Sequence, residues 1–259
     1  MSITDAIILG LVQGLTEFIP ISSSGHLILI DKLTGVQSSF AFDVLVNIGT
    51  LLALVVYFRN NLTELAQNVL RHKDYRLLAL IVASTIPALV VGGIWSDVFA
   101  GDDVRNLTTV GVMLGVVGVL MLAADHFWQG QLKIAKLNRP KAWLIGLAQA
   151  VALIPGTSRS GATILMGRAL GLSNAQAAEY SFLIAIPIIG GAVLRSLFDE
   201  PTQALLNGDK TVIIAGITSA FISGFFAIAF LLRFLKTRGL KVFGLYRIIL
   251  ALWLLLGLT

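Results

Sequence analysis

The sequence predicts an all-α polytopic membrane protein with six transmembrane helices and two re-entrant pairs of half-helices, arranged as an inverted-topology repeat. The first observation is composition: 56% of the 259 residues are hydrophobic and only 13% are charged. The mean hydropathy of +0.88 is far above that of a soluble domain. The second observation is that the apolar stretches fall into long and short classes. The third is an internal similarity at a fixed offset. Residues 1–259 are therefore expected to form a single membrane domain.

Charge and cysteine content exclude several kinds of chemistry. The chain contains no cysteine, which rules out disulfides, thiolate catalysis and cysteine-based metal sites. Its formal net charge of +5 would suggest a nucleic-acid partner in a soluble protein. In a membrane protein, basic residues chiefly report orientation. Because no basic-aromatic pattern accompanies them, we expect no nucleic-acid partner.

The apolar stretches alternate between two short pieces and three long ones, twice along the chain. The first short pieces are residues 3–16 and 24–34. Twelve helical residues cover about 18 Å, against roughly 30 Å of hydrocarbon, so neither piece spans alone. Six stretches are long enough to span, namely 40–58, 77–97, 107–125, 176–197, 210–235 and 242–258. Two more short pieces, 142–154 and 158–170, lie between the third and fourth of these.

Basic residues predict the orientation, because short cytoplasmic loops collect Lys and Arg. Three segments, 59–76, 126–141 and 233–241, each carry four Lys or Arg residues and are expected to be cytoplasmic. The intervening loops are acidic and are expected to face outward. Following the spans back places both termini outside. The first pair of half-helices then enters from outside, and the second pair enters from the cytoplasm.

An offset of 136 residues aligns the two halves of the chain. It pairs Gly10, Leu11, Gln13, Ser22, Ser24, Gly25, Ile28 and Leu29 with Gly146, Leu147, Gln149, Ser158, Ser160, Gly161, Ile164 and Leu165. Matched Gln, Ser and Gly positions indicate a duplication, with copies at approximately 1–125 and 137–259. Because each copy contributes three spans, the second copy is inverted. Paired broken helices in inverted repeats indicate a site near the bilayer midplane.

The first bend, residues 20–26, follows a carboxylate in otherwise apolar sequence. Gln13 and Glu17 lie four residues apart, so they share a helix face. Pro20 ends that helix, and the three serines 22–24 are N-cap candidates for the next, which carries His26. The free N–H groups and positive dipole end of the second helix would point toward Glu17. This arrangement suits a phosphate.

The second bend, residues 155–163, places Arg159 among hydroxyls and glycines at a helix start. Arginine binds phosphate oxygens in a fork, and glycine lets backbone N–H groups approach them. Two structural alternatives stay open: Arg159 neutralises Glu17 in an ion pair, or Glu17 is protonated and packs between helices. Ionisable residues at membrane depth usually mark function. Arg168 and Arg247 are interpreted as snorkelling residues at the membrane interface.

The two bends together resemble the signature motifs of a known family. The motifs are Gln13-x-x-x-Glu17, the Pro-x-Ser-Ser-Ser-Gly-His run at 20–26, and Pro-Gly-x-Ser-Arg-Ser-Gly-Ala-Thr at 155–163. They resemble those of undecaprenyl pyrophosphate phosphatase, the bacitracin-resistance family, and the similarity covers the whole chain. It implies hydrolysis of the C55 lipid pyrophosphate to the monophosphate that carries cell-wall precursors. The site would face the exterior of the bacterial inner membrane.

The resemblance also assigns residue roles. Catalytic roles fall on Glu17, Ser23, His26 and Arg159. Phosphate-binding roles are expected for Ser22, Ser24, Gly25, Thr157, Ser158, Ser160 and Gly161. The implied cofactor is a divalent cation, Mg²⁺ or Ca²⁺, held by Glu17 with Gln13. The family has Glu or Gln at the position of Gln13, and the Gln here weakens the expectation that two carboxylates share the metal. Expected partners are the polyprenyl pyrophosphate lipid and the membrane, with a homodimer as a possible assembly.

Two questions stay open at the level of sequence, and one alternative class is rejected. Ser23, His26 or an activated water each satisfy the pattern as the attacking group, and Ser23 assisted by His26 is favoured. A secondary transporter or lipid flippase would also have inverted repeats and a midplane anion site. The phosphatidic-acid phosphatase class is rejected, because it needs a histidine six residues after the arginine, where this chain has Leu165.

Overall fold

The computed structural model describes residues 1–36, 39–101 and 103–257, and the named secondary-structure elements in these ranges are all helices. Its elements in chain order are α1 (Ile3–Phe18), α2 (Ser23–Thr34), α3 (Phe40–Tyr57), α4 (Arg59–Leu70), α5 (Arg76–Ala100), α6 (Leu107–Phe127), the 3₁₀ helix η1 (Ile134–Lys136), α7 (Arg139–Val151), α8 (Arg159–Ala169), α9 (Asn174–Ser196), α10 (Glu200–Leu206), α11 (Lys210–Phe234) and α12 (Lys241–Leu255). The prediction of an all-α membrane protein is confirmed.

Five of the described helices are long and apolar enough to cross a membrane: α3, α5, α6, α9 and α11. The sixth predicted span, 242–258, corresponds to α12, which ends at Leu255 after 15 residues. Residue 258 lies outside the described residues. A helix of 15 residues is about 22 Å long, which is short for a span on its own.

The segment 59–76 was expected to be a loop, and this expectation is wrong for most of it. Residues 59–70 form the 12-residue helix α4. The stretch contains neither Gly nor Pro, so its backbone has no strong reason to leave the helical region. Leu62 and Leu65, three residues apart, pack against the main core and leave the charged face outside.

Four short helices, α1, α2, α7 and α8, lie where the sequence predicted half-helices, and the chain breaks between them at the expected places. Helix α1 ends at Phe18, and Ile19 is already extended, at φ −65° and ψ 133°. This is the conformation that a following proline, here Pro20, favours. The second break contains Pro155 and Gly156, and Gly156 has a φ of +89° that a side chain would oppose.

Helix pairs related by the 136-residue offset pack in the same way. Helix α1 packs on α11, and its counterpart α7 packs on α5. Both contacts need a small residue. A Cβ atom on Gly146 would lie 2.7 Å from the Ser84 carbonyl oxygen, and one on Gly10 would meet the Gly216 carbonyl. Such close approach through small residues is common in membrane helix packing.

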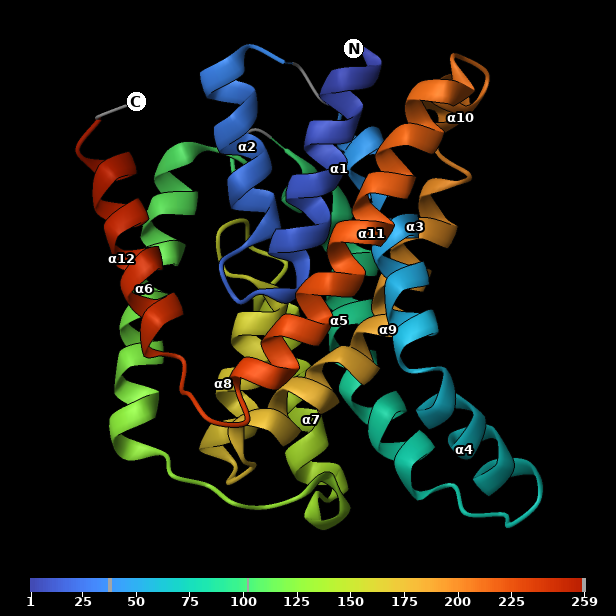
Figure 1. The fold of residues 1–259 in the computed structure, drawn as a ribbon, viewed down its shortest axis with the longest axis vertical. Coiled ribbons are helices and arrows are strands. Elements are labelled where there is room, and N and C mark those ends of the chain that lie inside the picture. Colours follow the sequence, from blue (N-terminus) through green and yellow to red (C-terminus); the bar gives the residue numbers. More distant parts are fainter. Residues whose placement is uncertain (37–38, 102, 258–259) are drawn as a thin grey trace.

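The ends of the elements segregate along the long axis of the molecule. Figure 1 shows both termini and α10 at one end, with α4, the segment before α7 and the α11–α12 connection at the other. The three basic segments therefore share one end. Helices α1 and α2 run from the first bend toward the termini, whereas α7 and α8 run from the second bend toward the basic end. The two bends meet in the middle of the molecule.

Candidate active site

Glu17 is the centre of a polar cluster between the two bends. Its Oε2 accepts hydrogen bonds from Ser23 Oγ at 2.7 Å and from Gln13 Nε2 at 2.9 Å. Its Oε1 accepts from Arg159 Nη2 at 3.0 Å, in an ion pair whose side chains are 13% (Arg159) and 11% (Glu17) exposed. The structure thus brings the predicted acid, hydroxyl and guanidinium within hydrogen-bond distance. We call Gln13, Glu17, Ser23 and Arg159 the Glu17 cluster.

Asn47 on α3 extends this cluster, and the sequence interpretation missed it. Gln13 Nε2 also donates to Asn47 Oδ1 at 2.7 Å, and Asn47 Nδ2 donates to the Asp43 carbonyl at 2.9 Å. The available signal was a lone amide within an 18-residue apolar span. Asp43 itself forms an ion pair with Arg105 at 3.1 Å. Asn47 therefore fixes the orientation of the Gln13 amide.

Ser22 and Ser158 build the two bends with the same backbone device. Both have positive φ values, 77° and 72°, which are unusual for residues other than glycine. Each hydroxyl caps the following helix: Ser22 Oγ accepts from Gly25 N at 3.4 Å, and Ser158 Oγ accepts from Gly161 N at 3.1 Å. Such strain persists only where the surroundings enforce it, and it concentrates at functional sites.

Two further serines occupy matching positions after these caps. Ser24 Oγ lies 3.4 Å from Ser22 Oγ, and Ser160 Oγ lies 3.2 Å from Ser158 Oγ. Ser160 Oγ also donates to the Glu17 carbonyl at 3.3 Å, so it joins the second bend to the end of α1. The hydroxyls of the four serines predicted to bind phosphate therefore form hydrogen bonds within the protein, and these bonds stabilise the two bends beside the Glu17 cluster.

Arg247 on α12 was interpreted as a snorkelling residue, and this is wrong. Its side chain is fully buried and bonds carbonyl oxygens from three parts of the chain. The acceptors are Pro20 at 3.2 Å in the first bend, Gly156 at 2.8 Å and Thr157 at 3.0 Å in the second, and Met113 and Leu114 on α6. One guanidinium thus ties both bends together, because its five N–H groups can satisfy several acceptors at once.

Arg168, the other residue interpreted as snorkelling, is also buried. Its guanidinium pairs with the Asp125 carboxylate and donates to the Trp128 carbonyl. It therefore joins the end of α8 to the end of α6. The sequence could not reveal this partner, because 43 residues separate the two charges.

His26 does not bond Ser23 in this structure. Its Nδ1 lies 2.7 Å from the Ser22 carbonyl, and its Nε2 lies 2.7 Å from the Tyr246 hydroxyl on α12. The two rings stack at 5.8 Å with an interplanar angle of 9°. A carbonyl can only accept, so Nδ1 carries the proton and the Tyr246 hydroxyl donates to Nε2. The base nearest to Ser23 is Glu17.

Two buried polar atoms beside the cluster have no hydrogen-bond partner among the described residues. They are Thr157 Oγ1 and Arg159 Nη1. Buried polar groups are almost always satisfied, so each exception needs an explanation. A guanidinium nitrogen and a hydroxyl are both donors to phosphate oxygens. An oxyanion bound at the start of α8 would satisfy both of them.

The Glu17 cluster offers few protein ligands for the predicted metal ion. Over the described ranges, no group of three or more His, Cys, Asp or Glu residues could hold a metal ion. Glu17 contributes a carboxylate, and Gln13 uses its amide nitrogen to bond Glu17 and Asn47, which leaves its amide oxygen available. Mg²⁺ is often held by one or two carboxylates with substrate phosphates and water completing the shell. The oxygen donors present fit a cation of that kind.

Fold and site together define a class of protein. A carboxylate, a hydroxyl and a guanidinium lie within the membrane domain, between two pairs of broken helices, with unsatisfied donors for an oxyanion. This is a polytopic membrane protein that acts on a phosphate-bearing substrate. Residues 6–253 match the family model described as bacitracin resistance protein BacA.

Curated relatives extend over nearly the whole chain. A protein named undecaprenyl-diphosphatase from Pelobacter propionicus is 39% identical over 258 residues, covering 96% of this chain and 94% of its own length. Proteins of the same name are 38% identical in Rubrobacter xylanophilus, covering 97% and 96%, and 40% identical in Alcanivorax borkumensis, covering 98% of both chains. The chain belongs to the BacA family of bacitracin resistance proteins.

Proposed function

We propose that this membrane hydrolase cleaves undecaprenyl diphosphate to undecaprenyl phosphate and inorganic phosphate, which recycles the lipid carrier for cell-wall synthesis. The observation that carries the proposal is the Glu17 cluster, in which Ser23 Oγ and Arg159 Nη2 both bond the Glu17 carboxylate within 3.0 Å. The full-length relatives named undecaprenyl-diphosphatase support the substrate. A transporter would need the anion site but has no use for a hydroxyl bonded to a carboxylate.

Ser23 is the proposed nucleophile. Its Oγ attacks the terminal phosphorus as Glu17 Oε2, 2.7 Å away, accepts the proton. The bond from phosphorus to the bridging oxygen breaks, and undecaprenyl phosphate leaves. Water then attacks the phosphoserine, which releases inorganic phosphate and restores the hydroxyl. Arg159 binds the equatorial oxygens, where charge develops, and its unpartnered Nη1 is the group that gains a bond.

His26 is a weaker candidate for attack than the sequence suggested. Tyr246 holds its Nε2, and the Ser22 carbonyl holds its Nδ1. Direct attack by His26 would require Tyr246 to release Nε2. A water activated by Glu17 stays the third possibility, and it differs from both covalent routes because it leaves no phosphoenzyme.

The divalent cation stays a proposal. Glu17 with the Gln13 amide oxygen would hold it, and the pyrophosphate and water would supply the other ligands. When bound, the cation neutralises charge on the pyrophosphate. Without it, Arg159 is the cation of the Glu17 cluster. Chelation of divalent ions is therefore expected to reduce turnover without changing the melting temperature much.

The proposed topology has six spans, with α12 as the sixth, and two inverted copies at about 1–125 and 137–259. Support comes from the common offset, which pairs α1 to α6 with α7 to α12 in order, and from the opposite directions of the two half-helix pairs (Figure 1). The basic end is proposed to be cytoplasmic, so the Glu17 cluster opens to the exterior of the bacterial inner membrane. The lipid tail would lie along apolar helix surface.

Two experiments test this function and orientation. Purified protein in detergent, given a polyprenyl pyrophosphate and Mg²⁺, is expected to release inorganic phosphate with no membrane gradient. A protein that only moves lipid would release none. An Asp103→Cys variant is expected to react with an impermeant reagent on intact cells, because residue 103 is proposed to face outward. The label reports this position alone, because the native chain has no cysteine. Labelling only after permeabilisation would contradict the outward-facing site.

A further inference from the structure

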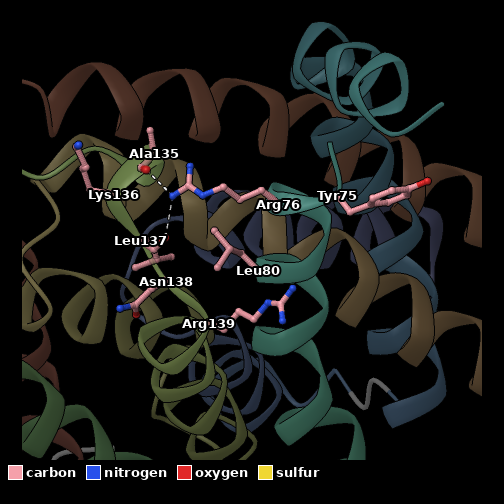
Figure 2. Close-up of a pocket in the computed structure, with 8 residues that line it drawn as sticks. All are labelled: Tyr75, Arg76, Leu80, Ala135, Lys136, Leu137, Asn138 and Arg139. Atoms are coloured by element: carbon pink, nitrogen blue, oxygen red, sulfur yellow. Dashed lines mark hydrogen bonds between the residues drawn. The ribbon is translucent and has the colours of Figure 1, made fainter. Parts of the chain in front are cut away.

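A cavity of about 560 Å³ lies at the basic end of the molecule, whereas the Glu17 cluster lies in its middle. It is formed where α5 begins, beside the connection from η1 to α7 (Figure 2). Its lining residues are Tyr75, Arg76, Leu80, Ala135, Lys136, Leu137, Asn138 and Arg139. We call it the basal pocket. Three of its eight residues are cationic and none is acidic.

The charge of the basal pocket is not neutralised within the described residues. Arg76 Nη2 donates to the carbonyls of Ala135 and Leu137, which fixes the connection but leaves the positive charge in place. The ion pairs of the described chain involve Arg105, Arg159 and Arg168, and neither Lys136 nor Arg139 takes part in one. Asp74 is the acid at its edge, where it accepts from Arg76 N at 3.0 Å. An anion is therefore the complementary ligand.

Figure 2 shows how the two arginines are placed. Arg76 extends from α5 toward the connection, and Arg139 extends from the start of α7 toward α5, so the two side chains run past each other in opposite directions. Arg139 is also the first residue of α7. The N-terminus of α7 adds free backbone N–H groups and the positive end of the helix dipole to the basal pocket.

An exposed apolar surface continues from the pocket along α7. On α7, Trp143 lies one turn beyond Arg139 and is 43% exposed, and Leu147 one turn further is 44% exposed. A cation, then an aromatic ring, then aliphatic side chains is the order met on crossing from the headgroup region into hydrocarbon.

We propose that the basal pocket binds one anionic phospholipid, with its phosphate at Arg139 and the start of α7 and its acyl chains along Trp143 and Leu147 of α7. Basic pockets between helices at the membrane rim are suited to anionic head groups. A free phosphate would use the cations but not the Trp143 stripe. The site is separate from the Glu17 cluster, so it does not depend on the proposed reaction.

The test measures lipid binding to the full-length protein in detergent by native mass spectrometry, with phosphatidylglycerol as the probe and phosphatidylcholine as the zwitterionic comparison. The pocket variant carries Lys136→Gln with Arg139→Gln. The matched control, Lys236→Gln with Arg238→Gln, removes the same charge from exposed positions at the same end. We expect one phosphatidylglycerol retained, at least tenfold weaker binding in the pocket variant, and less than a twofold change in the control.

Three outcomes would overturn the proposal. They are equal losses in the pocket and control variants, equal retention of phosphatidylcholine, and full displacement of the lipid by inorganic phosphate or glycerol phosphate at matched concentration. The last would show that only the head-group charge is bound. Arg139→Lys keeps the charge and should keep most binding, whereas Trp143→Ala should weaken lipid binding several-fold. Melting temperatures of all variants separate lost binding from lost folding.

Discussion

The two bends share one backbone design and differ in nearly all of their chemistry. Ser22 and Ser158 have φ values within a few degrees of each other, and each caps the glycine three residues later. At the offset of 136, however, Glu17 corresponds to Leu153, Ser23 to Arg159 and His26 to Ala162. The first bend supplies a carboxylate, a hydroxyl and an imidazole. The second supplies the cation and unsatisfied donors.

This difference indicates how a symmetric scaffold becomes an asymmetric site. The strained serine caps set where each helix begins, so the residue after the cap, Ser23 or Arg159, is aimed at the space between the bends. Substitution at that one position then changes the chemistry without changing the fold. Neither bend holds a complete site. The predictions below remove, one at a time, a group that contributes to the Glu17 cluster or a contact that holds a bend or its neighbouring helix in place.

The largest effect is expected from removing the charge contributed by either bend. Glu17→Ala and Arg159→Ala should each lower turnover by at least roughly a hundredfold, because each removes a group that stabilises developing charge or accepts the proton. The measurement is phosphate release from a polyprenyl pyrophosphate. If Arg159→Ala instead kept near-normal turnover and only melted at lower temperature, the ion pair would be structural.

Substitution of Ser23 tests the proposed nucleophile, which only the first bend supplies. Ser23→Ala should reduce turnover by roughly a hundredfold and abolish a covalent phosphoenzyme, and Ser23→Cys should keep a trace of activity. Ser24→Ala, one residue further on, is the control and should still form the phosphoenzyme. Rapid quench of labelled substrate gives the answer through the stability of the bound label. An acid-labile label would assign attack to His26, and turnover with no label at any time would assign it to water.

Arg247 tests whether the two bends must be held together. Arg247→Met keeps the length of the side chain but leaves the carbonyls of Pro20, Gly156 and Thr157 without their donor. A hydrogen bond to a charged group contributes roughly 1.5–3 kcal/mol, so we expect a melting temperature lower by several degrees and turnover lower by about tenfold. A variant that melts normally and turns over normally would show that the bends are fixed by α1, α2, α7 and α8 alone.

Tyr246 tests the restraint on His26. Tyr246→Phe keeps the stacked ring and removes the hydroxyl that lies 2.7 Å from Nε2. Loss of one neutral hydrogen bond is worth about 1 kcal/mol, which predicts a change in turnover of no more than about fivefold. His26→Ala provides the comparison for loss of the whole imidazole. A much larger loss in Tyr246→Phe than in His26→Ala would show that Tyr246 acts on its own.

Sequence was sufficient for the features that depend on local chemistry. Pro20 and Pro155-Gly156 predicted the helix breaks, apolar length predicted the five long helices but not the shortness of α12, and charges at membrane depth singled out Glu17 and Arg159. The ion pair between these two residues agrees with the expectation that the two bends meet. The partners of Arg247 and Arg168 could not be predicted, because a buried arginine and a snorkelling one look alike until the carbonyls and carboxylates around them are placed. Tertiary contact also decided that His26 faces Tyr246 rather than Ser23.

The smallest effects are expected at a pair of equivalent glutamines that have different partners. Gln13 Nε2 bonds Glu17 and Asn47, whereas Gln149 Nε2 bonds the Ser84 carbonyl at 3.0 Å on α5. Gln13→Ala should therefore lower turnover by no more than about threefold, far less than Glu17→Ala, and leave the melting temperature nearly unchanged. Gln149→Ala should do the reverse: it loses a buried hydrogen bond worth about 1 kcal/mol, which corresponds to roughly 2–4 °C in melting temperature, with turnover nearly normal. Both variants are measured for phosphate release and thermal melting in one detergent. If the two substitutions gave the same profile, the functional division between the bends would not extend to the helices that precede them.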